Sequence, residues 1–162
     1  MTDLDLGNNN LVSLPDEMDQ LKNLTELYVT YNKLKTVPNV IYKLKNLTEL
    51  NMRSNRIESI SEEIGNLTKL TELWLDDNQL TFLSKSIGNL VNLQNGNGLH
   101  IHRNPLIKSL PDSIRKIKHA FFNPKNKYKF NAMVDHAEYR VEQRVQRRLV
   151  IILAKEPKEA TH

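Results

Sequence analysis

The feature that most constrains the fold is a motif that recurs every 23 residues. The tetrapeptide Leu-Thr-Glu-Leu occupies positions 24–27, 47–50 and 70–73. The same later columns are apolar in every unit, and an asparagine recurs at Asn9, Asn32, Asn55 and Asn78. Self-similarity at such a period indicates stacked repeats: one unit cannot bury its own apolar residues, but several together form a continuous core.

Each unit carries signals for two short elements. The Leu-x-Leu alternation, as in Leu27 and Val29, predicts a short strand with one buried face. The later Ile-x-x-Leu spacing, as in Ile64 and Leu67, predicts a helical element. The asparagine stands where the strand must turn, and its amide can bond backbone groups that the turn leaves unpaired. We interpret these leucines and asparagines as scaffold.

The complete unit, Leu-x-x-Leu-x-Leu-x-x-Asn-x-Leu-x-x-Leu-Pro, resembles the leucine-rich-repeat family, over about five repeats in residues 1–119. The 23-residue form, with Pro15, Pro38 and Pro111 and with Ile-Gly-Asn-Leu at 64–67 and 87–90, resembles the intracellular Ras-group and scribble-like repeats. The resemblance implies an α/β solenoid, a right-handed curved coil with a short parallel sheet on its concave side. It also implies a non-enzymatic scaffold, adaptor or regulator in signalling that binds proteins on that side.

The fifth unit departs from this phase. Gly96 replaces the expected leucine within Asn95-Gly-Asn-Gly98, and the pattern resumes three residues late at Leu99 and Ile101. Because glycine and asparagine permit positive φ, we expect a local bulge before the last strand. Asn104-Pro105 then forms the turn that follows it.

Residues between the inward leucines face outward, and these positions hold the candidate partner-binding site. The candidates are Tyr28, Tyr31, Asn51, Arg53, Trp74, Asp76, His100, His102 and Arg103. Trp74 is the only tryptophan of the chain and stands near the centre of this set. Tryptophan, tyrosine and arginine are the types most enriched at binding hot spots, which favours a protein interface. The alternative is that Trp74 packs sideways on neighbouring columns.

Catalysis, metal binding and cofactors are not expected. His100 and His102 face the same side of one strand with Asp76 beside them, a set that could bind zinc or act as a base. However, His-x-His is a weak motif, and an open sheet does not exclude water. The recurring glutamates follow from the repeat itself. No phosphate loop, nucleophile elbow or zinc-finger spacing occurs in the sequence.

The positive charge is concentrated in the last quarter of the chain. Residues 1–119 hold 14 basic and 14 acidic residues, whereas residues 120–162 hold 9 and 5. A neutral repeat region does not resemble a general nucleic-acid binder. Residues 135–155 are predicted to form a helix with Arg140, Arg144, Arg147 and Arg148 on one face.

Three roles are open for this basic segment, residues 120–162. It can cap the last repeat, bind nucleic acid or an anionic membrane with the repeats as passive scaffold, or be a degenerate tail. The second role is the alternative function for the whole chain.

Two features bear on compartment and chain ends. The chain has no cysteine, and its start lacks the pattern of a signal peptide, so we expect a cytoplasmic protein. Met1 already occupies a leucine column, so no capping element precedes the first strand. This favours a truncated chain over one in which Asp3 and Asp5 protect the edge by charge. The identity of the partner does not follow from the sequence.

Overall fold

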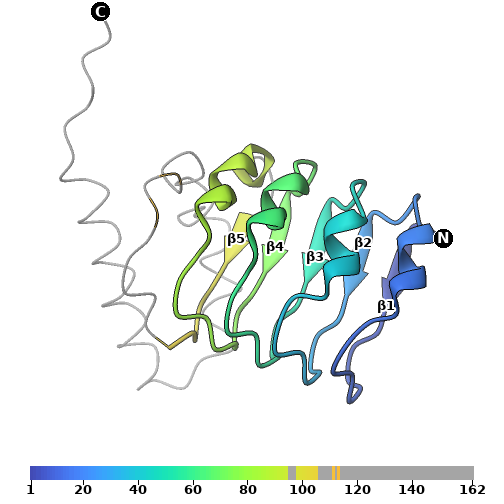
Figure 1. The fold of residues 1–162 in the computed structure, drawn as a ribbon, viewed down its shortest axis with the longest axis horizontal. Coiled ribbons are helices and arrows are strands. Elements are labelled where there is room, and N and C mark those ends of the chain that lie inside the picture. The colour runs from blue at the N-terminus through green and yellow to red at the C-terminus, as the bar shows by residue number, and fades with distance from the viewer. Residues whose placement is uncertain (95–97, 106–110, 112, 114–162) are drawn as a thin grey trace, which may run out of the picture. The chain divides into compact units, whose positions relative to one another are not determined.

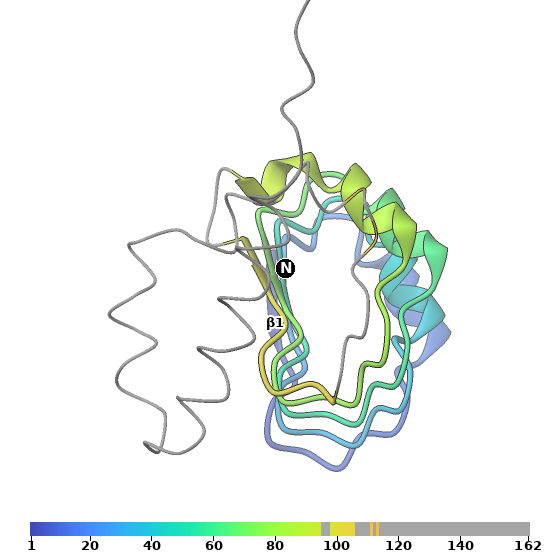
Figure 2. The ribbon, with the colours of Figure 1, turned by 90° about the vertical axis from the view of Figure 1, so that its left-hand side faces the viewer.

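The computed structural model describes residues 1–94, 98–105, 111 and 113. These residues form a stack of coil turns in which strands make one wall and short helices lie on the other side of each turn (Figures 1 and 2). The predicted helix at 135–155 lies outside the described residues. No helix in the described part of the chain is both long and apolar enough to cross a membrane.

Each turn contributes one three-residue strand to a single parallel sheet in sequence order. The strands are β1 (Asp3–Asp5), β2 (Glu26–Tyr28), β3 (Glu49–Asn51), β4 (Glu72–Trp74) and β5 (Gly98–His100). The central leucines pair directly, Leu27 with Leu50 and Leu50 with Leu73. The strands predicted from the Leu-x-Leu alternation are therefore confirmed.

The last strand confirms the expected slip in phase. Leu73 pairs with Leu99, which is 26 residues later in the chain, whereas the preceding leucines pair at a distance of 23. Gly98, at the start of β5, has a φ of 83°. Three additional residues are thus inserted before β5 without disturbing the register of the sheet.

The predicted helical elements are 3-10 helices. They are η1 (Asp16–Gln20), η2 (Asn39–Lys43), η3 (Glu62–Asn66), η4 (Lys85–Asn89) and η5 (Val91–Gln94). Bonds three residues apart, such as Leu67 N to Ile64 O at 3.0 Å, define them. Such helices are typically short, because their hydrogen-bond geometry is poorer than that of an α-helix. Pro15 and Pro38 precede η1 and η2, whereas the hydroxyls of Ser61 and Ser84 cap η3 and η4.

The core lies between the strands and the helices. The inward leucines of the central strands, Leu27, Leu50 and Leu73, are fully buried, but Leu4 of β1 is only partly buried. Each central turn is covered by a neighbour on both sides, whereas β1 has one neighbouring strand. Stacking therefore creates the core, as expected when one unit cannot bury its own leucines.

Gly65 in the Ile-Gly-Asn-Leu motif allows close approach of adjacent turns. A Cβ atom there would lie 2.8 Å from Ser86 Cβ and 2.9 Å from Ser86 O on the next turn. Gly88 has the same relation to Ser113, at 2.5 Å from its Cβ. Glycine is thus required by the packing of one turn on the next.

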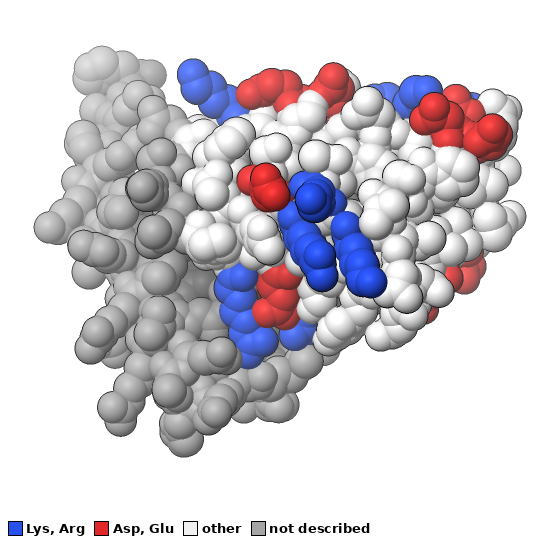
Figure 3. All heavy atoms as spheres, turned by 60° about the horizontal axis from the view of Figure 1, so that its bottom comes forward, with Lys and Arg blue, Asp and Glu red and all other residues white. Residues whose placement is uncertain are grey.

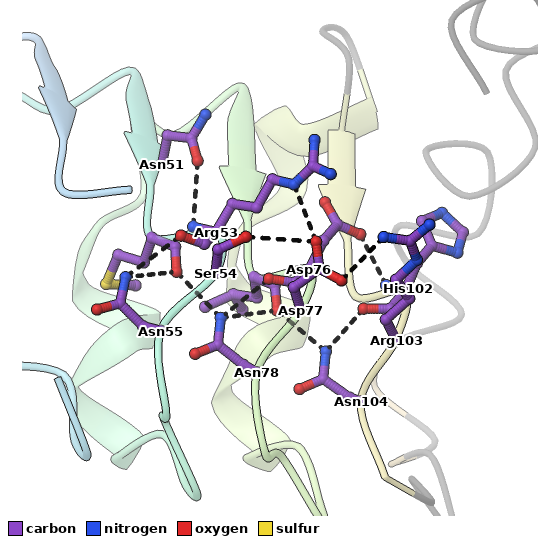
Figure 4. A network of polar contacts seen from close by, with 12 residues as sticks. Asn51, Arg53, Ser54, Asn55, Asp76, Asp77, Asn78, His102, Arg103 and Asn104 are labelled. Atoms are coloured by element: carbon purple, nitrogen blue, oxygen red, sulfur yellow. Dashed lines mark hydrogen bonds and ion pairs between the residues drawn. The ribbon is translucent and has the colours of Figure 1, made fainter. Parts of the chain in front are cut away.

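A line of asparagines binds each turn to the one before it. Asn55 Oδ1 accepts a bond from Leu34 N at 3.1 Å, and its Nδ2 donates to Val29 O at 2.9 Å and Met52 O at 3.1 Å. The asparagine ladder consists of Asn32, Asn55, Asn78 and Asn104. Figure 4 shows its last three members. The turn role predicted for these amides is confirmed.

Candidate functional site

The side chains that alternate with the buried leucines form one surface, which we call the sheet face. It consists of the outward residues Asp3, Asp5, Gly7, Glu26, Tyr28, Thr30, Glu49, Asn51, Arg53, Glu72, Trp74, Asp76, Gly98, His100 and His102. The register places Tyr28, Asn51, Trp74 and His100 in one row across four strands. The outward placement expected from the sequence for these four residues is therefore present.

Trp74 is held by contacts on two sides. Its ring stacks on that of His100, with centroids 3.5 Å apart and planes 4° apart. Its Nε1 donates to Glu72 Oε2 at 3.2 Å. Trp74 remains partly exposed, whereas His100 is 9% exposed. The sideways packing considered from the sequence thus occurs, and it fixes the indole on the sheet face.

Tyr28 is tied to its own strand in the same way. Its hydroxyl donates to Glu26 Oε2 at 2.8 Å. Burial raises the pKa of the Tyr28 phenol, and the bond to Glu26 and the charge of Glu49 raise it further. The phenol therefore stays protonated at neutral pH and acts as a fixed donor. Tyr31, three residues beyond the end of β2, is 50% exposed.

The chain leaves each strand through a residue in the left-handed region. These residues, with φ between 52° and 56°, are Asn8, Tyr31, Ser54, Asp77 and Arg103. A residue with a β-carbon adopts this conformation at a cost, so neighbouring contacts must hold it. Tyr31 and Arg103 are thus placed on the row of turns beside the sheet face.

Asp77 joins two of the candidate arginines (Figure 4). Arg53 Nε lies 3.1 Å from Asp77 Oδ2, and Arg103 Nη1 lies 3.2 Å from Asp77 Oδ1. All three side chains are less than one-third exposed. Sequence reasoning omitted Asp77 from the site. The sequence did show that Asp77 occupies the same repeat position as Ser54 and Arg103. However, the left-handed turn that orients these side chains was not predicted.

The side chains of Asp76 and His102 are mostly buried in the protein. Asp76 is 7% exposed, and its Oδ1 accepts a bond from His102 N at 2.8 Å. Burial lowers the pKa of the His102 imidazole to about 4, and the charges of His100 and Arg103 add to this. His102 is therefore neutral at pH 7. Among the described residues no group of three or more His, Cys, Asp or Glu side chains is placed to hold a metal ion.

The surface shown in Figure 3 carries mixed charge. Most of this face is uncharged, and its basic and acidic side chains are interspersed. A nucleic-acid footprint is typically a continuous basic patch. The described part of this face therefore resembles a polar protein surface more than such a footprint.

Comparison with family models agrees with the repeat. The model "Leucine rich repeat" matches residues 1–57, and the model "Leucine Rich repeats (2 copies)" matches residues 45–85. Together they span all of β1 to β4. Sequence comparison with curated proteins gives no match.

Several solved structures share the fold. A leucine-rich-repeat protein of Leptospira interrogans has a TM-score of 0.62 and 39% identity over 68% of this chain. An internalin, InlF, of Listeria monocytogenes has a TM-score of 0.56 and 27% identity over 74%. The PEPR1–AtPEP1 crystal structure has a TM-score of 0.60 and 22% identity over 72%, which shows likeness of fold.

These structures are much longer than the present chain. The match spans 27% of the Leptospira protein, 32% of the internalin and 16% of the chain in the PEPR1 complex. The repeats of this chain thus correspond to a part of each.

Proposed function

Because this chain belongs to the leucine-rich-repeat family, whose members are generally protein-interaction modules, we propose that it binds a protein partner through the sheet face. Within this proposal the chain is a cytoplasmic scaffold or adaptor of the Ras-group or scribble-like type. It needs no cofactor and catalyses no reaction.

The fixed position of Trp74 carries the proposal. Its ring is held by the stack on His100 and the bond to Glu72, yet part of it faces solvent. A side chain that is already ordered loses little conformational entropy when a partner covers it. Tryptophan is also the residue type most enriched among binding hot spots. Partner contact therefore has a rigid aromatic anchor near the centre of the sheet.

The flanking polar groups support the same use. Tyr28 is oriented by Glu26 on one side of the anchor, and Arg53 by Asp77 on another. Both side chains are partly exposed. Oriented polar groups around an aromatic anchor supply specificity in protein interfaces.

The test is a quantitative pull-down from cell lysate with the full chain and three variants. Trp74→Ala removes the anchor. Phe82→Ala is the matched control, because Phe82 is 51% exposed but lies outside the sheet face. The third variant ends at residue 119 and lacks the basic segment. Circular dichroism establishes that each variant is folded.

The expected result is a protein that the full chain, Phe82→Ala and the shortened chain retain and that Trp74→Ala loses at least tenfold. A partner retained by Trp74→Ala but lost on shortening would overturn the proposal. The function would then belong to the basic segment, whose nucleic-acid or membrane contact is salt-dependent.

A further inference from the structure

The row of Tyr28, Asn51 and Trp74 places a smaller side chain between two aromatic side chains. These residues pair in register on β2, β3 and β4, so Asn51 has one aromatic residue on each side. All three side chains are partly exposed. The strands that carry the two rings are two spacings apart, which is about 9.6 Å. The centre of the sheet face therefore presents two aromatic side chains at a fixed interval.

The stack on His100 sets the direction of the indole of Trp74. The ring of His100, on β5, covers one face of the indole and is nearly parallel to it. The indole therefore stands upright, with its second face turned toward β3 and Tyr28. Within the described part of the chain, neither that face nor the ring of Tyr28 contacts another aromatic ring. The two rings can thus be covered by groups of a ligand.

The amide of Asn51 is oriented by its own strand. Its Oδ1 accepts a hydrogen bond from Arg53 N at 3.2 Å. Because a backbone N–H needs an acceptor in front of it, the Nδ2 group must point the other way. Figure 4 shows this nitrogen directed away from Arg53 N. Among the described residues Nδ2 has no bonding partner, so an oriented donor stands between the two rings.

The interval and the donor together indicate the conformation of the ligand. A polyproline II helix rises 3.1 Å per residue with three residues per turn, so residues three apart share one side at about 9.3 Å. This matches the interval between the two rings. Its carbonyls make no internal hydrogen bonds and can accept one from Asn51. The carbonyls of an α-helix are bonded internally, and residues on one face of a β-strand recur at about 6.8 Å.

We propose that the sheet face binds a proline-rich segment of its protein partner, with two prolines three residues apart packed against Tyr28 and Trp74. A carbonyl between these prolines accepts from Asn51 Nδ2. This rests on the proposed function and specifies the chemistry of the partner. Proline-rich segments dock on aromatic side chains, and their preformed helix loses little entropy on binding. The segment crosses the strands, because β2, β3 and β4 already pair on both sides and cannot accept an added strand.

The test uses the full chain and a capped synthetic peptide of repeated Pro-Ala-Ala. The control peptide has the same composition, with its prolines placed so that no two are three residues apart. Trp74 is the only tryptophan, so its fluorescence reports binding at the sheet face. We expect a saturable change in emission that persists at high salt, because the peptide is uncharged. The control peptide is expected to bind at least about tenfold more weakly.

Two pairs of variants test the contacts. Asn51→Asp keeps an oxygen for Arg53 N but replaces the donor by an acceptor, and Asn23→Asp makes the same change at an exposed position outside the sheet face. Tyr28→Ala removes one ring of the row, whereas Phe82→Ala removes an exposed ring elsewhere. The changes at Asn51 and Tyr28 are each expected to weaken peptide binding about fivefold or more, and the two controls less than about twofold.

Circular dichroism establishes that each variant is folded, and Tyr28→Ala carries the test by itself if Asn51→Asp does not fold. Equal binding of the two peptides would overturn the proposal, because proline spacing would then play no part. An emission of Trp74 that neither peptide changes would overturn it too, as would peptide binding unaffected by either sheet-face variant. A lysate partner that is lost by Trp74→Ala, found together with no peptide binding, would leave the proposed function standing and reject only the proline-rich selectivity.

Discussion

The rings of Trp74 and His100 are stacked across β4 and β5, with centroids 3.5 Å apart and planes 4° from parallel. The pair therefore links β4 to β5, the strand that follows the three-residue insertion. His100→Ala is expected to destabilise the protein by about 1 kcal/mol and to change the emission of Trp74. Urea unfolding followed by fluorescence and by circular dichroism measures both effects. Unchanged emission would show that the stack does not persist in solution.

Low pH is expected to destabilise the protein through His102. Its pKa is about 4 in the folded protein, compared with about 6.5 when unfolded, so the unfolded state binds the proton more readily. The contribution of His102 is therefore fully present above pH 6.5 and is lost as pH falls from about 6.5 to about 4. The loss is on the order of a few kcal/mol.

Thermal unfolding between pH 7.5 and 4 tests this by comparing wild type with His102→Gln, which keeps a neutral polar side chain. The wild type is expected to lose more stability than the variant over this range. Parallel curves would mean that His102 titrates normally.

Removing one rung of the asparagine ladder is expected to be costly. Asn55→Ala leaves Leu34 N and Val29 O without the hydrogen bonds that they make to the Asn55 side chain. Asn55 itself is only 8% exposed. We expect a loss of about 2–4 kcal/mol. Asn9→Ala is the control, because Asn9 is exposed and is expected to cost less than about 1 kcal/mol. Urea midpoints measure the difference; similar losses would contradict a role for burial.

Asp77→Asn tests the link between Arg53 and Arg103. Asparagine keeps the size of the side chain and tolerates positive φ, so the variant removes mainly charge. Loss of two partly buried ion pairs is expected to cost about 1 kcal/mol, and less at high salt. Asp19→Asn, which removes a single, longer pair at 3.7 Å with Lys43, whose side chain is 54% exposed, is expected to have no measurable effect. Equal effects of the two variants on melting temperature would show that the Asp77 link adds nothing.

Gly65→Ala tests whether the close packing at residue 65 outweighs the higher helix propensity of alanine. Alanine favours a helix by up to about 1 kcal/mol, but its Cβ would lie 2.8 Å from Ser86 Cβ. We expect a net loss of about 1–3 kcal/mol. Adding Ser86→Gly removes one contact but leaves the Ser86 carbonyl at 2.9 Å, so denaturant unfolding should show partial rescue. A stabilised single variant would refute close packing of η3 on η4.

The fold was predictable because its determinants repeat. Spacing alone placed Leu27, Leu50 and Leu73 in one buried row, and it placed the late strand at Leu99. The candidate site was predictable only as rows of positions. Which side chains contact one another depends on strand-exit turns in the left-handed region, and residue type gave no signal for this conformation at Tyr31 or Arg103.

The burial of polar residues in the candidate site could not be predicted from the sequence either. Asp76 stands in an outward column, yet it accepts a bond from the backbone of His102 and is almost inaccessible. The uses of the sheet face and of the basic segment remain predictions.

The hydrogen bonds of the asparagine ladder do not depend on the length of the repeat. Asn104 donates to Leu75 O at 3.0 Å across an interval of 29 residues, whereas Asn78 reaches Met52 O at 3.0 Å across 26. These hydrogen bonds between adjacent turns are thus the same whether the unit has 23 or 26 residues. Residues can therefore be inserted before a strand of such a chain while the order and spacing of the sheet-face side chains stay unchanged.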